Sequence, residues 1–457
     1  MSSIPSTFRI LGFKDAYVLM VGNILGIGIF TTTGYIAQYV SDPGYMILIW
    51  VIGGFISFCG GVTYAELSTR FPHAGGDFHY LTHAYHPILG FLFGWAALLV
   101  TYTGSIAVIA VGFSHYFLNF FGSEAREWHL AMPGIGTGIT LHKIIAVLIT
   151  LFFTYVNVRG VRSGALFQRF FTFLSLFVFG SYIIAGLTSP QGNWEHLTPA
   201  FQRFPDLGIT SKLGVALIGV YFTYSGWTVL AYVAGEIQNY RRNIPRATWT
   251  GVATVTVIYI LINIVYLYAM PLWSMENVID IGHHVLLILR GAGLSIVFNI
   301  AILMAVLSTL NATVLSGARI YFAMSREKEF FPVFGKIHSI YNTPAAALWL
   351  QFGWTVILIL TGSFNQLLTY TVFVMLGFGV LSGFALFLLR IKQETPVSHY
   401  LAWGYPYTTI FYMVIVLWIM FNTFLDQPLE TMAGVVLVAT GILFYWYFRK
   451  KFQKKYL

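Results

Sequence analysis

Charged residues and cysteine are scarce in this chain. Only 9% of its 457 residues are Asp, Glu, Lys or Arg, and Cys59 is the one cysteine. One cysteine excludes an internal disulfide, and because Cys59 falls inside an apolar run we expect no disulfide-linked partner subunit. The hydrophobic share is 57% and the mean hydropathy is +0.75. These values exclude a soluble domain of this size and indicate a protein that crosses the lipid bilayer many times.

The apolar segments predict an all-α membrane protein with twelve transmembrane helices. The stretches between them are too short to fold alone, so residues 1–457 are predicted to form a single membrane transport domain. The predicted spans are residues 15–39, 44–65, 88–117, 142–158, 165–187, 212–235, 247–270, 285–318, 345–361, 366–389, 407–425 and 431–448.

Basic residues are distributed unevenly between the two sides of this topology. Of the 25 Lys and Arg residues, five fall on one side, and all others fall in the termini and the loops on the same side as the termini. The positive-inside rule then predicts cytoplasmic termini in a plasma membrane, or in the inner membrane of a bacterium. The net charge of +9 is therefore a topology signal, and we expect no nucleic-acid partner. The five external residues are Arg126, Lys143, Arg203, Lys212 and Arg290.

Two of the predicted spans contain a motif that should interrupt the helix. Residues 22–30 read GNILGIGIF, with three glycines in seven residues, and residues 222–227 read FTYSGW. Glycine holds a helix poorly, and free backbone groups in hydrocarbon are costly unless they bind something or line a cavity. Paired interruptions of this kind are typical of the binding site of a secondary transporter.

The two interruptions fall at corresponding places in two halves of five spans. The first half is residues 15–187 and the second is residues 212–389, followed by two additional helices in residues 407–448. The halves begin on opposite sides of the membrane, so a repeated five-helix unit must be inverted.

Several motifs in this order resemble the amino acid–polyamine–organocation permeases, and the resemblance is strongest to their L-type amino acid transporter branch. It covers about the first 340 residues and implies the LeuT-type five-plus-five inverted repeat with broken helices 1 and 6. The motifs are residues 22–30, residues 64–72 (YAELSTRFP) with Gly75-Gly76-Asp77, residues 222–227 with residues 236–245 (EIQNYRRNIP), Leu310-Asn311-Ala312 and Ser325-Arg326-Glu327.

A broken helix suits the two charged ends of an amino acid. The N–H groups of Gly26, Ile27 and Gly28 are predicted to face the substrate carboxylate. The substrate ammonium is predicted to lie near carbonyl oxygens of the two breaks, which belong to Ile24, Phe222 and Ser225. No charged residue is securely placed at mid-membrane, so a neutral amino acid is the expected substrate.

The resemblance adds residues around this site. It implies that Phe222 is a gate that closes over the substrate, and that Thr223 takes up room where Ala is common. Tyr102 and Ser105 of the third span are candidates for the opposite wall, although their hydroxyls could instead join helices. Ile27 stands where the family often has Ser, Ala or Thr.

The coupling ion is predicted to be Na⁺. Alignment to the family places Ser175 where many of these permeases carry a lysine, and Ser308 and Thr309 where exchangers have small residues. With the carbonyls of Ile24 and Leu25, these hydroxyls would form an oxygen cage for Na⁺. No other cofactor is expected. Hydroxyls that only bond their own helix are the structural alternative.

The sequence thus predicts a secondary transporter of neutral L-amino acids that works by alternating access, with sodium symport as the favoured coupling. A sodium-independent exchanger and a proton symporter are the alternatives, followed by an amino acid sensor that does not transport. An enzyme is not expected, since the spans carry no buried nucleophile, base or metal set. His79 and His83 have metal-ligand spacing, yet only Asp77 stands near His73, His79, His83 and His86 to complete a site.

Overall fold

The computed structural model describes residues 11–72, 75–132, 135–160, 164–198, 207–327, 329–341, 343–392 and 400–453. His73 and Arg203, which entered the sequence analysis, lie outside the described residues. The chain divides into two compact units, each of which combines segments from both predicted halves. Unit 1 contains residues 1–76, 165–305 and 379–426, and unit 2 contains residues 77–164, 306–378 and 427–457.

Unit 1 holds the two predicted helix interruptions. Helix α14 continues along the chain from unit 1 into unit 2, and α16 continues from unit 2 into unit 1. Its elements are α1 (Phe13–Ile24), α2 (Gly28–Thr31), α3 (Thr33–Ala37), α4 (Pro43–Arg70), α10 (Gly164–Leu187), η3 (Trp194–Leu197), α11 (Leu207–Tyr224), η4 (Ser225–Thr228), α12 (Val229–Tyr232), η5 (Ala234–Glu236), α13 (Tyr240–Ala269), η6 (Leu272–Met275), the first part of α14 (Ile281–Arg326), the last part of α16 (Phe364–Lys392) and α17 (Tyr407–Asp426).

Unit 2 contains the third predicted span. Its elements are α5 (Asp77–Ala84), α6 (Pro87–Ala96), η2 (Ala97–Thr101), α7 (Tyr102–Leu118), α8 (Gly122–Glu127), β1 (His129–Met132), β2 (Ile135–Thr140), α9 (Leu141–Arg159), the last part of α14, η7 (Pro332–Gly335), α15 (Ala345–Thr361), the first part of α16 and α18 (Pro428–Gln453).

The structure confirms a helical protein that crosses the membrane many times. Among the described residues, 11 helices are long and apolar enough to span a bilayer. The segment predicted as the ninth span forms the apolar helix α15, which at 17 residues is shorter than these. The protein is therefore a multi-pass membrane protein.

In unit 1, helix α4 packs against α13, α17 and α11. Its glycines make this packing close. A Cβ atom added to Gly54 would lie 2.3 Å from the Thr256 hydroxyl on α13, and one added to Gly61 would lie 2.5 Å from Thr248. Small residues that let helices approach are the usual means of association inside a membrane, where water-driven burial is absent.

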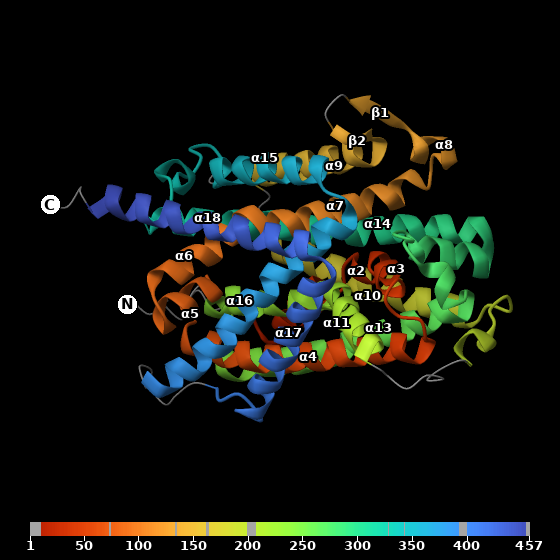
Figure 1. Ribbon diagram of the computed structural model, residues 1–457, viewed down its shortest axis with the longest axis horizontal. Helices are drawn as coiled ribbons and strands as arrows, with labels where there is room; N and C mark the ends of the chain where they lie inside the picture. The colour runs from red at the N-terminus through yellow and green to blue at the C-terminus, as the bar shows by residue number, and fades with distance from the viewer. Residues whose placement is uncertain are drawn as a thin grey trace. The chain divides into compact units, whose positions relative to one another are not determined.

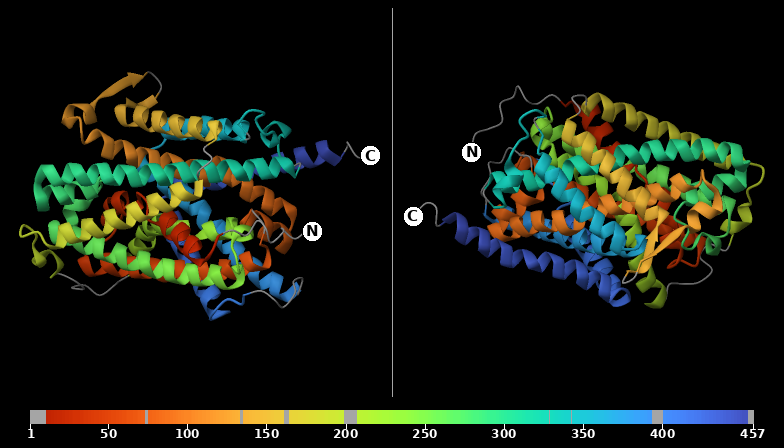
Figure 2. Two further views of the ribbon diagram at one scale, coloured as in Figure 1. Left: turned by 180° about the vertical axis from the view of Figure 1, so that it is seen from behind. Right: turned by 90° about the horizontal axis from the view of Figure 1, so that it is seen from above.

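In unit 2, α7 packs against both α9 and α15, which lie side by side in the views of Figures 1 and 2. Helix α18 packs against α6. Polar contacts reinforce this unit: the Trp95 indole N–H donates to the Thr440 hydroxyl at 3.0 Å, and the Lys143 ammonium donates to the Leu360 carbonyl at 2.8 Å.

Three features of the fold were not predicted. The segment 118–141, which lies between two predicted spans, contains α8 and a short antiparallel hairpin of β1 and β2. The third span contains a π-helical turn, η2. Helix α14 runs through residues 281–326 with non-helical backbone at Gly291, where φ is 76°. None of these carries a hydrophobic-period signal that a span prediction would detect.

Candidate functional site

The first predicted interruption is present in unit 1. Helix α1 ends at Ile24, α2 begins at Gly28, and Leu25, Gly26 and Ile27 between them are not helical. The Gly26 N–H donates to the Ile24 carbonyl at 2.8 Å, and Leu25 continues the helical pattern by donating to Val21 at 2.8 Å.

The donors left over lie just beyond this segment. Within the described part of the chain, the N–H groups of Ile27, Gly28 and Ile29 have no backbone acceptor. All three residues are buried, with Ile27 only 1% exposed. Buried N–H groups without an acceptor are rare and costly, and at the start of a helix they favour an anion. This segment is therefore the part of unit 1 best suited to bind a carboxylate.

The second interruption is a 3₁₀ turn, η4, rather than a gap. Helix α11 continues through Phe222 and Thr223 to Tyr224 before the turn begins at Ser225. The Ser225 hydroxyl donates back to the Phe222 carbonyl at 2.8 Å. Phe222, the predicted gate, is 7% exposed and lies one turn before η4.

Glycines bring the two interruptions into direct contact. A Cβ atom added to Gly226 would lie 2.3 Å from the Asn23 carbonyl oxygen, which is backbone and cannot easily move aside. A Cβ atom added to Gly28 would lie 2.7 Å from the Thr223 hydroxyl and 2.9 Å from the Thr223 Cα. Only glycine fits at either position without separating the two chain segments. The predicted residues Ile24, Gly28 and Thr223 are thus brought together.

Tyr259 of α13 joins both interruptions and was missed by the sequence analysis. Its hydroxyl lies 2.7 Å from the Ile24 carbonyl and 3.2 Å from the Thr223 carbonyl. Trp50 and Tyr224 hold its ring, with ring centroids 5.4 Å and 5.1 Å away. A lone tyrosine in an apolar helix carries no sequence signal, so only the fold identifies it.

Threonine hydroxyls complete this contact. The Thr223 hydroxyl donates to the Gly219 carbonyl at 2.8 Å and lies 2.9 Å from the Thr32 hydroxyl. The Thr32 hydroxyl also donates to the Gly28 carbonyl at 2.9 Å. The two hydroxyls have two protons for these three contacts, so the protons are shared between the Gly219 and Gly28 carbonyls and the contact between the threonines.

The remaining predicted residues are divided between the units. Ser175 lies buried on α10 in unit 1. Tyr102, Ser105, Ser308 and Thr309 are half-buried or more in unit 2. The Ser105 hydroxyl donates to the Thr101 carbonyl one turn back, at 2.6 Å, which is the bond expected of a serine with a structural role.

The π-helical turn η2 in unit 2 differs from the interruptions of unit 1. Each of its five carbonyls accepts a hydrogen bond from a side chain. The donor–acceptor pairs are Tyr321 to Ala97 at 3.0 Å, Thr103 to Leu98 at 2.7 Å, Trp354 to Leu99 at 2.7 Å, Thr371 to Val100 at 3.4 Å and Ser105 to Thr101 at 2.6 Å. The turn is consequently saturated by the protein itself.

The histidine alternative gains no support. Among the described residues, no group of three or more His, Cys, Asp or Glu side chains is placed to hold a metal ion. The His83 Nδ1 atom instead lies 2.8 Å from the His79 carbonyl oxygen.

A multi-pass helical protein whose two interrupted spans meet through glycine, with buried N–H donors left over, has the build of a membrane transporter. The chain belongs to the amino acid permease family, whose sequence profile matches residues 11–448. Its function is accordingly amino acid transport across a membrane, and it is not an enzyme. The resemblance noted in the sequence is confirmed.

Curated relatives match nearly the whole chain. The serine/threonine exchanger of Bacillus subtilis is 26% identical over 447 residues, which cover 96% of this chain and 97% of that relative. The human Asc-type amino acid transporter 1 is 28% identical over 442 residues, covering 94% and 80%. The human large neutral amino acids transporter small subunit 2 is 28% identical over 456 residues, covering 95% and 79%.

Proposed function

We propose that this protein transports neutral amino acids by alternating access and binds the substrate carboxylate at the N–H groups of Ile27, Gly28 and Ile29. The observation that carries this proposal is the presence of three buried donors without a backbone acceptor beside a contact between two interrupted spans. A carboxylate supplies the missing acceptors, and the partial positive charge of the N–H groups favours it.

The substrate is proposed to have an uncharged side chain. The residues that meet at the two interruptions are Asn23, Ile24, Thr32, Thr223 and Tyr259, and none of them is charged. A charged substrate side chain would have no counter-charge there, and its desolvation would be costly. The relatives named for serine, threonine and large neutral amino acids support the same class.

The proposed architecture is the twelve-span, LeuT-type inverted repeat. The protein is proposed to lie in the plasma membrane, or in the inner membrane of a bacterium, with both termini in the cytoplasm. On this proposal α15 is the ninth span, since 17 residues at 1.5 Å per residue come within a few ångströms of the bilayer core. The excess of basic residues on the side of the termini supports the orientation.

Two coupling modes are proposed. Sodium coupling rests on the hydroxyls of Ser175, Ser308 and Thr309 with the carbonyls of Ile24 and Leu25. The Ile24 carbonyl already accepts from both Gly26 and Tyr259, which counts against it as an ion ligand and equally as the predicted ligand of the substrate ammonium. The similarity to a serine/threonine exchanger supports exchange.

Uptake into proteoliposomes tests both the substrate class and the coupling mode. Radiolabelled L-serine, L-threonine and L-leucine should accumulate, whereas L-arginine and L-glutamate should not. Exchange predicts uptake only when unlabelled substrate is inside, at equal rates in sodium and choline buffers at fixed pH. Sodium coupling predicts uptake into empty vesicles that requires an inward sodium gradient. Uptake of none of the neutral amino acids would refute the proposed function.

A further inference from the structure

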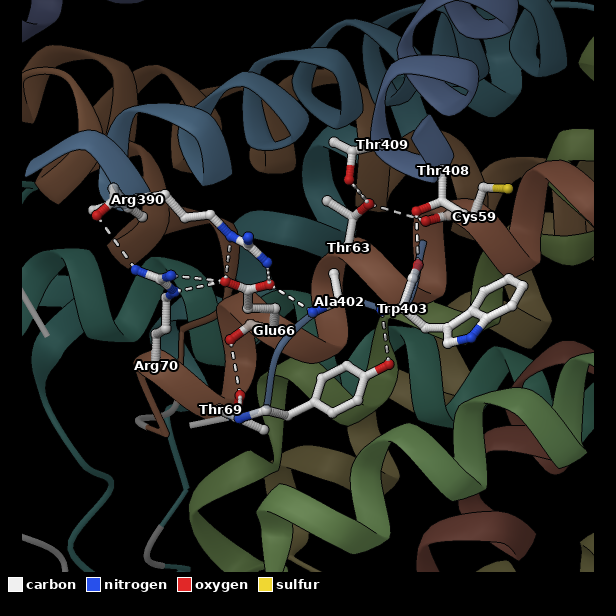
Figure 3. A network of polar contacts seen from close by, with 12 residues as sticks. Cys59, Thr63, Glu66, Thr69, Arg70, Arg390, Ala402, Trp403, Thr408 and Thr409 are labelled. Carbon is white, nitrogen blue, oxygen red and sulfur yellow. Dashed lines mark hydrogen bonds and ion pairs between the residues drawn. The ribbon is translucent and has the colours of Figure 1, made fainter. Parts of the chain in front are cut away.

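One face of the C-terminal part of α4 is polar and is bonded to the end of α16, to residues 400–402 and to the start of α17 (Figure 3). The Thr63 hydroxyl lies 3.0 Å from the Thr409 hydroxyl, and the Thr69 hydroxyl accepts the Tyr400 N–H at 3.2 Å. Glu66 lies between the two threonines. Spacings of three residues place these side chains on one face of the helix. We call this set, Thr63, Glu66, Thr69 and Arg70, the polar face of α4.

The Glu66 carboxylate is the centre of the polar face. It is fully buried and accepts five hydrogen bonds from three residues (Figure 3). Two come from Arg70, at 3.0 and 2.7 Å, and two from Arg390 near the end of α16, at 3.0 and 2.5 Å. The fifth comes from the Ala402 N–H at 2.7 Å. One carboxylate therefore joins α4, α16 and the connection to α17.

Arg390 is held in a fixed orientation. Its Nε and Nη2 atoms contact different oxygens of Glu66, which is the bidentate geometry that lysine cannot reproduce. Its guanidinium also lies 3.6 Å from the centre of the Tyr405 ring. Arg70, on the other side of the carboxylate, donates to the Leu389 carbonyl at 3.3 Å.

Tyr64, which follows Thr63 on α4, connects this helix to the interruption of the sixth span. Trp227 of η4 packs edge-on against Tyr64 of α4, with ring centroids 5.0 Å apart, and against Tyr412 of α17, at 6.3 Å. Trp227 is 2% exposed. The side chain that follows Ser225 and Gly226 is therefore supported from α4 on one side and α17 on the other.

We infer that Glu66 and Arg390 are positioning residues for the substrate site. They hold α17 on α4 throughout the transport cycle, and this fixes Trp227 and the η4 turn. The inference rests on the proposed transport function. It predicts that weakening the polar face raises the substrate KM, because the site loses its shape while remaining present.

Arg390→Gln tests this with little risk to folding, because the Glu66–Arg70 pair remains to neutralise the buried charge. In proteoliposomes loaded with unlabelled substrate, we expect the L-serine KM to rise about tenfold. Arg390→Lys keeps the charge and loses the bidentate geometry, so its KM should lie between those of the wild type and Arg390→Gln. Arg246→Gln, an exposed arginine of α13, is the matched control and should leave KM unchanged.

A reversible disulfide separates positioning from general stability. Thr63→Cys with Thr409→Cys, in a Cys59→Ala background, should join α4 to α17 on oxidation. We expect this disulfide to leave transport intact in the otherwise wild-type chain, and to return the KM of Arg390→Gln to its normal value until a reductant is added. Formation is followed by loss of maleimide labelling.

Three results would overturn the inference. An Arg390→Gln protein with unchanged KM, even if recovered in lower amount, would make the polar face a matter of stability alone. Loss of transport on oxidation, restored by a reductant, would show that α4 and α17 separate during the cycle. A disulfide that forms without lowering the KM of Arg390→Gln would remove the link to α17. Absence of transport by the wild-type protein would instead refute the proposed function.

Discussion

Two helices of this protein depart from regular geometry in apolar surroundings, and they do so in opposite ways. In unit 2, each of the five carbonyls of the π-helical turn Ala97–Thr101 accepts a hydrogen bond from a side chain. In unit 1, the segment between Ile24 and Gly28 leaves the N–H groups of Ile27, Gly28 and Ile29 without a backbone acceptor within the described residues.

The difference distinguishes a structural irregularity from a binding one. Freed backbone groups in a membrane must find a partner, because no water is at hand. When the protein supplies every partner, the irregularity is closed and shapes the packing of α7 with α14, α15 and α16. When donors are left over beside glycines that hold two segments in contact, the missing partner is expected to be a ligand.

The largest effect is expected from Gly226→Ala. The new Cβ atom would lie 2.3 Å from the Asn23 carbonyl oxygen, so the two interruptions must separate. Overpacking of this kind costs about 1–3 kcal/mol, which corresponds to a loss of transport of about ten- to hundredfold. Gly180→Ala, where nothing lies within 4 Å, is the control. Normal initial uptake by Gly226→Ala would show that the contact is dispensable.

Tyr259→Phe should have the next largest effect. It removes the hydroxyl that donates to the Ile24 and Thr223 carbonyls and keeps the ring against Trp50 and Tyr224. The two carbonyls share the one proton of this hydroxyl, and a hydrogen bond contributes roughly 0.5–1.5 kcal/mol, so we expect about a tenfold lower kcat/KM for exchange with near-normal thermal stability. An equal loss in both measurements would assign Tyr259 to folding rather than to the site.

Trp354→Phe tests the closed irregularity and should reverse this pattern. It leaves the half-buried Leu99 carbonyl without its side-chain donor, a loss of roughly 1 kcal/mol of stability. We expect a lower midpoint of thermal unfolding and a substrate KM within about twofold of normal. A large change in KM at unchanged stability would mean that the π-helical turn also takes part in binding.

The smallest effect is expected at Glu329, outside the spans in unit 2. Burial, with a contribution from the Glu327 charge, raises the pKa of Glu329 to about 7. The folded protein therefore keeps this proton over a pH range, from about 4.5 to about 7, in which the unfolded chain loses it, so stability falls as the pH rises through that range.

Glu329→Gln cannot lose a proton and should avoid that loss. We expect its unfolding midpoint to exceed that of the wild type by about 1–3 °C at pH 8 and to match it at pH 4.5. Glu124→Gln, an exposed carboxylate of α8, is the control. A difference that does not change with pH would contradict the raised pKa.

Features of the fold that carry a local signal are predictable from the sequence. Glycine clustering located the interruption at residues 25–27, and long apolar runs located the spans. The sequence locates the second interruption only approximately. The break is a 3₁₀ turn that begins at Ser225, after Phe222 and Thr223, and the Ser225 hydroxyl bonds back to the Phe222 carbonyl. Serine and threonine in an apolar run do not reveal which carbonyl they will bond.

What was missed depends on contacts between distant parts of the chain. Tyr259 lies 235 residues from its partner Ile24, and Arg390 lies 324 residues from Glu66. The π-helical turn is held by side chains of three other helices, so residues 97–101 read as ordinary helix. Packing partners of this kind are not encoded in any local pattern.

The central claim is that the open N–H groups of the first span bind the substrate, whereas the saturated π-helical turn does not. Hydrogen–deuterium exchange followed by mass spectrometry measures both segments in one experiment on the purified protein. The account predicts that L-serine slows exchange in peptides covering residues 25–30 and leaves residues 97–101 unchanged. Equal exchange of residues 25–30 with and without a transported amino acid would contradict it.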